Sequence, residues 1–315
     1  MTGLQILGSG HGLPKRCVTN EDMAQIVDTN NEWITTRTGI EQRYFCSEDE
    51  TCGQLAAQAA QQALQQANLS ADQIGLIVAA TFTSDYLTPS LACQVHQALG
   101  CTKPIPCMDV NAACAGFLYG LETARSLLMS GSANSEYALV IGAEGLSRVL
   151  DFTDRTSCVL FGDAAAAMVV RLADVPYSCI LNASGDTSSL FANSLLPNQS
   201  RFLQMDGKAI FRFAVDIIPK CLEQLLQKSG LTLEQIDHVV CHQANSRIID
   251  HVVKKLGAPP TMFYKNMQRF GNTSAASIPL ALDELLQNGT IRPGQKVVCI
   301  GFGAGLTWGA CLLSF

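Results

Sequence analysis

The sequence predicts an α/β fold, and two observations lead to that prediction. Short apolar runs with strand character alternate with longer helical stretches along the 315 residues, and one pattern recurs in the second half of the chain. With 48% hydrophobic and 15% charged residues, the chain can bury a large core, as one big domain or as two closely packed halves. Because buried strands in such an alternation commonly belong to parallel sheets, we expect largely parallel strands.

The individual elements follow from composition and spacing. Four short apolar runs bounded by polar residues are predicted strands: 74–80, 137–142, 236–241 and 296–301. Longer stretches with apolar residues at helical spacing are predicted helices: 52–67, 114–129, 210–228 and 277–287. The second helix is expected to end near Ser130 and Gly131, because glycine suits a helix C-terminus.

An internal repeat relates the two halves. Residues 69–78 (LSADQIGLIV) match residues 231–240 (LTLEQIDHVV) at an offset of 162 residues (231 − 69). The strand at 137 matches the strand at 296 at an offset of 159 (296 − 137), and Asn111 matches Asn272 loosely at an offset of 161 (272 − 111). We therefore expect two copies of one α/β unit, residues 1–172 and 173–315, with a site where they meet.

Composition argues against several classes of function. A net charge of −6 and a pI near 5.4 argue against nucleic-acid binding through bulk electrostatics. The first residues lack signal-peptide features, and no apolar run approaches the ~20 residues that span a bilayer, so we expect a cytoplasmic protein outside the membrane. The thirteen scattered cysteines are expected to be mostly reduced and buried, and the five histidines do not cluster with them as zinc ligands, so no metal site is expected.

Cys114 is the predicted nucleophile. It lies in DVNAACAGF (109–117), where an apolar run gives way to a predicted helix. Unpaired N–H groups and the positive end of the dipole at a helix start favour a thiolate, by roughly 0.3–1 kcal/mol when exposed. Small residues on both sides leave room for a substrate. The alternative is a buried cysteine that only packs, but this setting favours the nucleophile.

His242 and Asn272 are the predicted partners of Cys114. His242 follows an apolar strand in VVCHQANSRI (239–248), and catalytic side chains commonly project from strand ends in α/β sheets. Asn272 follows Gly271 at a helix start, and its repeat partner lies three residues before Cys114, so its loop is expected near the thiol. The alternatives are a structural histidine and an asparagine that is only a helix N-cap.

A glycine-rich segment, GFGAGLTWG (301–309), follows the last predicted strand. It lacks the P-loop lysine and the G-x-G-x-x-G spacing, and GSGHG (8–12) fails the same test. We expect it to bring a main-chain N–H close to a reacting carbonyl, where it donates to an oxyanion.

Taken together, these motifs closely resemble the β-ketoacyl-[acyl carrier protein] synthase III family, which starts type II fatty acid synthesis. The resemblance extends from NNEWITTRTGI (30–40) to Trp308 and rests on NAACAG (111–116), HQANSRI (242–248), GNTSAASIP (271–279) and the terminal glycine-rich segment. It implies a thiolase-like fold, a duplicated five-layer α-β-α-β-α structure.

The resemblance also implies a mechanism. Cys114 takes the acyl group of acetyl-CoA or a longer acyl-CoA, which is a substrate, so no cofactor is expected. Neutral His242 and Asn272 then donate to the thioester carbonyl of malonyl-[acyl carrier protein] and stabilise the enolate that forms as CO₂ leaves. The N–H groups of Cys114 and Ala304 form the oxyanion hole. Many relatives have glycine at the Ala304 position, but only its N–H is needed. The related elongating synthases have a second histidine where Asn272 stands, so the asparagine indicates an enzyme that starts acyl chains rather than one that elongates them.

Binding residues are carried over one at a time. Trp33 and Arg155 are expected to sandwich the adenine of CoA, with Thr29, Arg37, Gly207 and Asn245 along its path. The acidic acyl carrier protein is expected at a local basic surface made of Arg212, Gln243, Arg247, Lys254 and Lys255. The alternatives are core packing for Trp33 and a solvated face for the lysines.

Thr88 falls where the family places a residue of the neighbouring subunit at the end of the acyl pocket, often phenylalanine. We therefore expect a homodimer, and the smaller Thr88 predicts tolerance of acyl groups longer than acetyl. The alternative functions are a specialised Cys-His-Asn condensing enzyme of a polyketide or other secondary-metabolite pathway and a non-catalytic subunit that binds acyl-CoA or carrier protein. A thiol-redox or metal protein is the weakest alternative.

Overall fold

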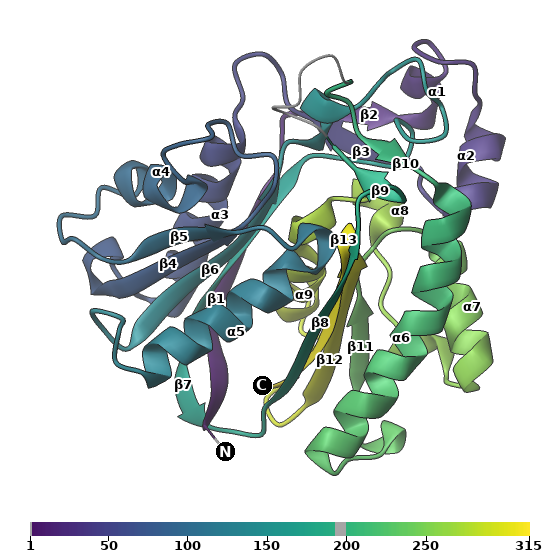
Figure 1. Cartoon of the computed structure of the whole chain (residues 1–315). Coiled ribbons are helices and arrows are strands. Elements are labelled where there is room, and N and C mark those ends of the chain that lie inside the picture. The colour runs from purple at the N-terminus through teal and green to yellow at the C-terminus, as the bar shows by residue number, and fades with distance from the viewer. Residues whose placement is uncertain (1, 193–199) are drawn as a thin grey trace.

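The computed structural model describes residues 2–192 and 200–315, and two central sheets organise it (Figure 1). The first sheet has the strand order β1-β7-β6-β4-β5. Its strands are β1 (Thr2–Gly12), β4 (Ile74–Ala80), β5 (Cys107–Val110), β6 (Tyr137–Glu144) and β7 (Ala164–Asp174). The second sheet has the order β11-β12-β13-β8. Its strands are β8 (Ser178–Asp186), β11 (His238–Cys241), β12 (Lys296–Gly303) and β13 (Gly305–Ser314).

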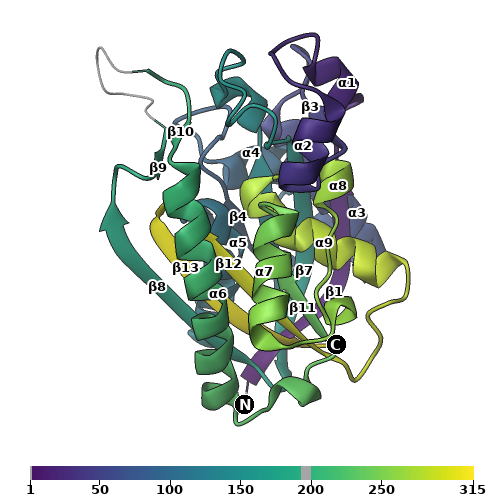
Figure 2. The same ribbon diagram turned by 90° about the vertical axis from the view of Figure 1, so that its right-hand side faces the viewer.

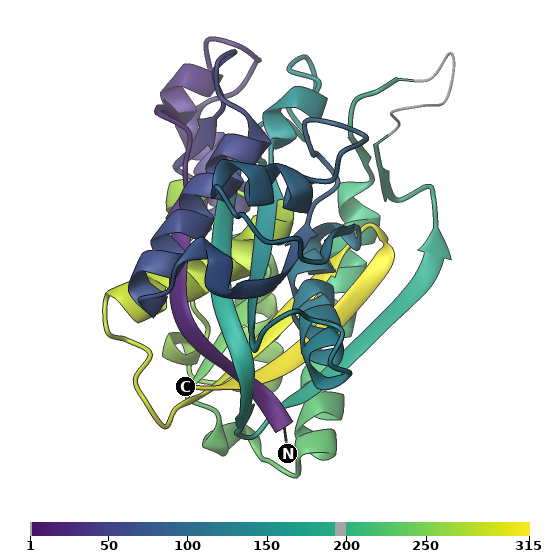
Figure 3. The same ribbon diagram turned by 90° about the vertical axis from the view of Figure 1, so that its left-hand side faces the viewer.

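Helices cover and separate these sheets in five layers. Helices α3 and α4 lie on the outer face of the first sheet (Figure 3), α5 and α9 lie between the sheets, and α6 covers the outer face of the second sheet beside α7 (Figure 2). The long helices are α3 (Cys52–Ala67), α4 (Leu91–Ala98), α5 (Gly116–Met129), α6 (Gly207–Ser229), α7 (Ser246–Leu256) and α9 (Ser277–Gln287). None of the helices in the described ranges is long and apolar enough to cross a membrane.

Smaller elements gather at one end of the molecule (Figure 1). They are the ribbons β2 (Arg16–Thr19) with β3 (Gln42–Phe45) and β9 (Leu190–Phe191) with β10 (Gln204–Met205), and the short helices α1 (Asn20–Met23), α2 (Asn31–Thr38) and α8 (Met267–Phe270).

The predicted repeat corresponds to matching positions in the two sheets. Strand β6 corresponds to β12, because each is third in its sheet when the strands are counted from β1 or from β8. Strand β4 corresponds to β11, because each is the next strand in that order. Each half also has a 3-10 turn, Ala113–Ala115 or Ser274–Ala276, immediately before its central helix α5 or α9. The predicted duplicated five-layer architecture is therefore confirmed.

The prediction of largely parallel sheets is wrong. Strand β4 pairs in parallel with β5 and β6, and β11 pairs in parallel with β12, but β7 and β13 run antiparallel to both of their neighbours. A single residue, Ala304, separates β12 from β13. So short a connection makes a hairpin, which requires antiparallel strands, whereas parallel strands need a long crossover.

The central layer is apolar on both sides because it faces two sheets. Leu118 and Leu121 of α5 and Ile278 and Leu282 of α9 share one core cluster with strands of both sheets. Complete burial of such a side chain contributes about 1.5–3 kcal/mol. This packing holds the starts of α5 and α9 side by side at the ends of the strands, where the candidate site lies.

Candidate active site

Cys114 lies in the tight turn between β5 and α5. The 3-10 turn Ala113–Ala115 contains it, and α5 begins two residues later, at Gly116. Ala113 has a left-handed backbone (φ 45°), which turns the chain sharply just before the thiol. Gly303 at the end of β12 faces this turn, and a Cβ there would lie 2.8 Å from the Cys114 nitrogen. Only glycine at residue 303 lets β12 approach so closely.

The Cys114 thiol is buried, with 6% of the residue exposed. Burial raises its pKa to about 12, although a hydrogen bond that the Ser274 hydroxyl donates to Sγ at 3.3 Å lowers it. The nearby Glu144 carboxyl raises the pKa further. The prediction that the helix start favours a thiolate is therefore wrong for the protein without substrate, because burial destabilises the charged sulfur by more than the helix start stabilises it. The nucleophile is a neutral thiol at neutral pH.

His242 follows β11 directly, and its N–H donates to the Ile300 carbonyl at 2.8 Å. Burial lowers the pKa of its ring to about 3, so the imidazole is neutral. Its Nδ1 lies 2.7 Å from the Ser277 hydroxyl, which also accepts the Gln243 N–H at 3.4 Å. Because that oxygen already accepts one hydrogen bond, its own proton is available for Nδ1. The ring proton then lies on Nε2, as a donor role requires.

Asn272 is fixed by its backbone and by its side-chain oxygen. Its N–H donates to the Leu160 carbonyl at 2.8 Å, and its carbonyl accepts the Gly162 N–H at 3.0 Å. Its Oδ1 accepts the Ser274 N–H at 2.9 Å, which directs the oxygen toward the 3-10 turn. This contact is an Asx turn and not a helix cap, because the N-cap position of the 3-10 turn is Thr273. The Nδ2 of Asn272 remains available to donate to a ligand.

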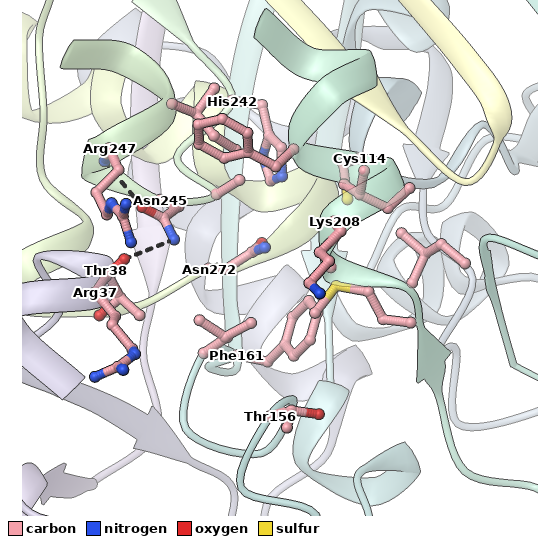
Figure 4. Close-up of a pocket in the computed structure, with 18 of the residues that line it drawn as sticks. Arg37, Thr38, Cys114, Thr156, Phe161, Lys208, His242, Asn245, Arg247 and Asn272 are labelled. Carbon is pink, nitrogen blue, oxygen red and sulfur yellow. Dashed lines mark hydrogen bonds between the residues drawn. The ribbon is translucent and has the colours of Figure 1, made fainter. Parts of the chain in front are cut away.

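Cys114, His242 and Asn272 line one cavity of about 560 Å³, and Figure 4 shows the three side chains converging within it. The structure thus brings together the three predicted reactive residues, which come from the segments after β5, β11 and α8. Four exposed cations line the same cavity: Arg37, Lys208, Arg212 and Arg247. Such a cavity offers a reactive thiol at one place and charges suited to phosphate groups at another.

A second cavity of about 780 Å³ also reaches Cys114. Ala304, the predicted second oxyanion donor, lines this cavity together with Cys114 and Ser274. Phe82, Val149 and Leu203 add apolar surface to it. Cys114 therefore lies where two cavities meet, the first of which is also lined by the four exposed cations.

Among the residues predicted to bind CoA, those in the first cavity are Trp33, Arg37, Gly207 and Asn245. The Arg155 guanidinium carbon lies 5.1 Å from the centroid of the Trp33 ring. A base held between two planar groups needs about 7 Å between them, because each contact takes about 3.5 Å. A sandwiched adenine therefore requires Arg155 to move away from Trp33.

Asn245 borders the first cavity and makes further contacts, whereas Thr29 lies outside that cavity. Asn245 caps α7 by accepting the Arg247 N–H at 2.9 Å, and its Nδ2 donates to the Arg37 carbonyl at 3.1 Å. Thr29 is not among the residues that line the first cavity, and its Oγ1 is buried without a hydrogen-bond partner in the described part of the chain.

The predicted basic surface lies on α6 and α7, which run side by side (Figure 2). Arg212 on α6 and Arg247, Lys254 and Lys255 on α7 are all exposed. Lys255 also joins the two helices, because its Nζ donates to the Val215 carbonyl at 3.3 Å.

Gln243 does not belong to this surface, so the prediction that it contacts the carrier protein is wrong. Only 1% of the residue is exposed. Its Nε2 donates to the carbonyls of Cys241 at 2.7 Å and Tyr264 at 3.1 Å, and its Oε1 accepts the Asn266 N–H at 2.8 Å. The side chain is saturated inside the protein and holds the segment after β11 against the segment before α8.

Thr88 is exposed and lines neither cavity at Cys114 within the described chain. The neighbouring Tyr86 and Leu87 are large apolar residues with exposed fractions of 59% and 78%. The predicted role of Thr88 toward a second subunit stays a prediction.

Several site residues were missed in the sequence reasoning. Ser277 orients His242, Ser274 contacts the thiol, Glu144 lies close enough to affect the thiol pKa, and Lys208 lines the first cavity. Lys208 adjoins the predicted Gly207, which was a usable signal. Ser274 and Ser277 stand in the quoted segment GNTSAASIP (271–279), but nothing in it shows which side chains they contact, because their contacts and that of Glu144 depend on how this segment and β6 pack near β11 and the Cys114 turn.

Comparison with known proteins agrees with this geometry. Two family models match the sequence: 3-oxoacyl-[acyl-carrier-protein] synthase III over residues 108–189 and the C-terminal part of the same family over residues 226–315. A β-ketoacyl-[acyl-carrier-protein] synthase III of Clostridium perfringens is 44% identical over 326 residues, covering 99% of each chain.

Solved structures give the same result and confirm the predicted thiolase-like fold. The 3-oxoacyl-[acyl-carrier-protein] synthase III of Aquifex aeolicus superposes with a TM-score of 0.93 at 41% identity, covering 99% of this chain and 100% of that one. A priming β-ketosynthase from the R1128 polyketide biosynthetic pathway superposes with a TM-score of 0.92 at 36% identity, covering 99% and 96%. This chain belongs to the 3-oxoacyl-[acyl-carrier-protein] synthase III family.

Proposed function

We propose that this chain is an initiating condensing enzyme of type II fatty acid synthesis. It transfers an acyl group from acyl-CoA to Cys114 and joins it to malonyl-[acyl carrier protein]. The products are 3-oxoacyl-[acyl carrier protein], CoA and CO₂. The observation that carries the proposal is the convergence of a thiol, a neutral imidazole with its proton on Nε2 and an amide donor in one cavity.

In the first step, Cys114 Sγ attacks the thioester carbonyl of acyl-CoA, and the C–S bond to CoA breaks. The negative charge that develops on the carbonyl oxygen needs fixed donors. We assign this role to the N–H groups of Cys114 and Ala304, which lie on the second cavity.

In the second step, His242 and Asn272 act on the malonyl thioester. Loss of CO₂ leaves an enolate, and donors on its oxygen lower the energy of that charge. A neutral imidazole suits this role because its Nε2–H donates without needing to change its charge. The enolate carbon then attacks the acyl group on Cys114, and the thiolate of Cys114 leaves.

We assign CoA to the first cavity. Arg37 and Lys208 there supply positive charge for its phosphates. Trp33 and Arg155 hold the adenine once Arg155 has moved from the ring, and Gly207 and Asn245 border the path. The predicted contact of Thr29 with CoA stays a prediction.

We assign the carrier protein to the basic surface of Arg212, Arg247, Lys254 and Lys255. The positive charge of this surface attracts an acidic partner, and the net negative charge of the chain disfavours contact elsewhere.

We further propose that residues 1–172 and 173–315 are the two halves of a duplicated unit. Strand β7 of the first sheet ends at Asp174 and β8 of the second sheet begins at Ser178, so the chain passes between the sheets at residues 175–177, just after the proposed boundary. A homodimer that brings Thr88 to the acyl pocket of a second subunit is part of the same proposal. The predicted cytoplasmic location stays a prediction.

The reaction is tested by intact-mass spectrometry after incubation with acetyl-, butyryl- and octanoyl-CoA. We expect a mass increase equal to the acyl group on the wild type and none on Cys114→Ala. Absence of an adduct with every acyl-CoA would instead favour a non-catalytic binding subunit. Strict preference for acetyl-CoA would contradict the proposed effect of Thr88.

A second candidate function is a specialised condensing enzyme, which the similarity to the priming synthase of a polyketide pathway favours. The two functions differ in partner and primer. Turnover that requires the carrier protein of fatty acid synthesis, and that is lost with free malonyl-CoA, supports the first function. Turnover only with a pathway-specific carrier supports the second.

A further inference from the structure

Acylation of Cys114 requires an acceptor for the thiol proton. The thiol is neutral and buried, yet the nucleophile that forms the acyl-enzyme is sulfur without its proton. His242 is an unsuitable acceptor when Ser277 donates to its Nδ1, because its Nε2 then already carries the ring proton. Another group of the site can fill this role.

Glu144 is the buried carboxyl next to Cys114. It is the last residue of β6, and none of it is exposed. Its Oε2 accepts hydrogen bonds from the Thr81 hydroxyl at 3.3 Å, from the Phe82 N–H at 3.3 Å and from the Thr83 hydroxyl. Its Oε1 has no hydrogen-bond partner among the described residues. A buried carboxyl with one satisfied and one unsatisfied oxygen calls for an explanation.

Ser274 lies between this carboxyl and the thiol. Its hydroxyl donates to Cys114 Sγ at 3.3 Å, and it is also close enough to Glu144 to lower the pKa of that carboxyl. A hydroxyl has one proton and two lone pairs, so it can accept from a thiol while it donates to a carboxylate. To pass a proton from the thiol to the carboxyl, the hydroxyl must turn its own proton from Sγ to Glu144, whose Oε1 has no hydrogen-bond partner among the described residues.

We infer that Glu144 is a positioning residue that, through the Ser274 hydroxyl, takes the Cys114 thiol proton during acylation and returns it during condensation. The inference rests on the proposed function, because it supplies a proton route for the acylation of Cys114.

The proton balance closes over one catalytic cycle. As the bond from Sγ to the acyl carbon forms, the thiol proton moves to Ser274 Oγ, the Ser274 proton moves to Glu144 Oε1, and CoA leaves as a thiolate that solvent protonates. Glu144 holds the proton while the acyl-enzyme exists. When the enolate takes the acyl group, Cys114 leaves as a thiolate, and the same proton returns through Ser274 to restore the thiol.

The protonation state of Glu144 agrees with this task. Burial raises its pKa to about 7, while hydrogen bonds from Thr83, the Phe82 N–H, Ser274 and Thr81 lower it. A group with a pKa near the working pH is suited to accept and to return a proton.

Two thiols face this carboxyl. They are Cys114 in the 3-10 turn and Cys52 at the start of α3, and burial raises the pKa of both, with Glu144 as a further cause. Both therefore stay protonated near pH 7, and Glu144 is the group that titrates there.

The test measures acylation of Cys114 by acetyl-CoA, without malonyl substrate, by rapid quenching and intact mass between pH 5.5 and 9. We expect the wild-type rate to rise with pH through about 7, as Glu144 loses its proton. In Glu144→Gln the rate should fall about 100-fold at pH 8, and its rise with pH should disappear. Ser274→Ala should behave in the same way, and the double variant should be no slower than either single one.

Two controls separate this role from a structural one. Glu122→Gln changes a half-buried carboxyl on α5 that binds Arg125, and it should acylate like the wild type. CoA binding by titration calorimetry and the melting temperature report the shape of the site without deprotonation of Cys114. In Glu144→Gln the CoA affinity should equal that of the wild type.

The inference is overturned if Glu144→Gln and Ser274→Ala keep the wild-type rise with pH, or if Glu144→Gln loses CoA binding and acylation together. Should Glu144→Gln fail to fold, Ser274→Ala alone decides: a wild-type rate and pH profile would overturn the inference. A wild type that is not acylated at all would refute the proposed function itself, which distinguishes the two failures.

Discussion

The Ser277 hydroxyl lies 2.7 Å from Nδ1 of His242 and links the start of α9 to the end of β11. Because the hydroxyl also accepts the Gln243 N–H, we assign its own proton to the bond with Nδ1, which leaves the ring proton on Nε2. The orientation of the His242 imidazole therefore depends on a helix of the central layer.

Ser277→Ala should slow decarboxylation of the malonyl substrate about 10-fold, because the lost hydrogen bond is worth about 0.5–1.5 kcal/mol and the tautomer is no longer selected. Acylation of Cys114 should keep its wild-type rate. The two steps are measured separately, as CO₂ release and as acyl-enzyme formation. Ser314→Ala, which removes an exposed serine contact to the Pro176 carbonyl, is the matched control. Equal loss in both steps would contradict the prediction.

Gly303→Ala should displace the Cys114 turn. The added Cβ would lie 2.8 Å from the Cys114 nitrogen and 2.9 Å from its Cβ, so the turn or β12 must shift. Overpacking of this kind costs about 1–3 kcal/mol of folding free energy, and a shifted nucleophile loses acylation rate.

Gly185→Ala is the control for this substitution, because no atom of the described residues lies within 4 Å of a Cβ at that position of β8. Thermal unfolding and acyl-enzyme formation check both variants. A Gly303→Ala protein with wild-type stability and acylation would show that the close approach has no functional effect.

Trp33→Ala should weaken CoA binding about 10-fold, because aromatic stacking contributes about 0.5–1.5 kcal/mol beyond the area that it buries. Titration calorimetry with CoA measures this, and Trp33→Phe should recover part of the affinity. Trp308→Phe serves as the control, since Trp308 packs edge-on against Phe213 and does not line the first cavity. Unchanged affinity in Trp33→Ala would remove this residue from the CoA site.

His11 should stabilise the fold more in weakly acidic solution than in alkaline solution. Its Nδ1 lies 2.6 Å from Oδ2 of Asp283, and this hydrogen bond raises the pKa of His11 above 6.5. Burial acts to raise the pKa of Asp283, but hydrogen bonds from His11 and Ser9 bring it below 3.8. The charged pair is fully present between these two ordinary values. It is lost as the pH rises through the raised pKa of His11 or falls through the lowered pKa of Asp283.

Accordingly, His11→Gln should lower the melting temperature more at pH 6 than at pH 9. His96→Gln is the control, because His96 contacts only a backbone carbonyl, that of Lys103, through Nε2. An equal loss of melting temperature at both pH values would show that packing rather than charge stabilises this contact.

Much of the fold could be predicted from the sequence because burial leaves a periodic signal. The predicted helices at 52–67 and 277–287 and the predicted strand at 74–80 have the bounds that the structure gives to α3, α9 and β4. The strand directions could not be predicted in the same way. An apolar run looks alike in a parallel and an antiparallel sheet, and only the single residue between β12 and β13 forces the hairpin.

By itself, the sequence determined the α/β class and the duplicated architecture, and it predicted Cys114, His242 and Asn272 as reactive residues, because each stands in a motif that is visible in the local sequence. Only the tertiary structure decided the state of those residues. Burial keeps Cys114 a neutral thiol, Ser277 selects the tautomer of His242, and Gln243 turns inward. Protonation and hydrogen bonding depend on groups that lie far apart in the sequence and that packing brings together. His242 and Ser277 are separated by 35 positions, and Cys114 and Ser274 by 160. No local pattern records such contacts.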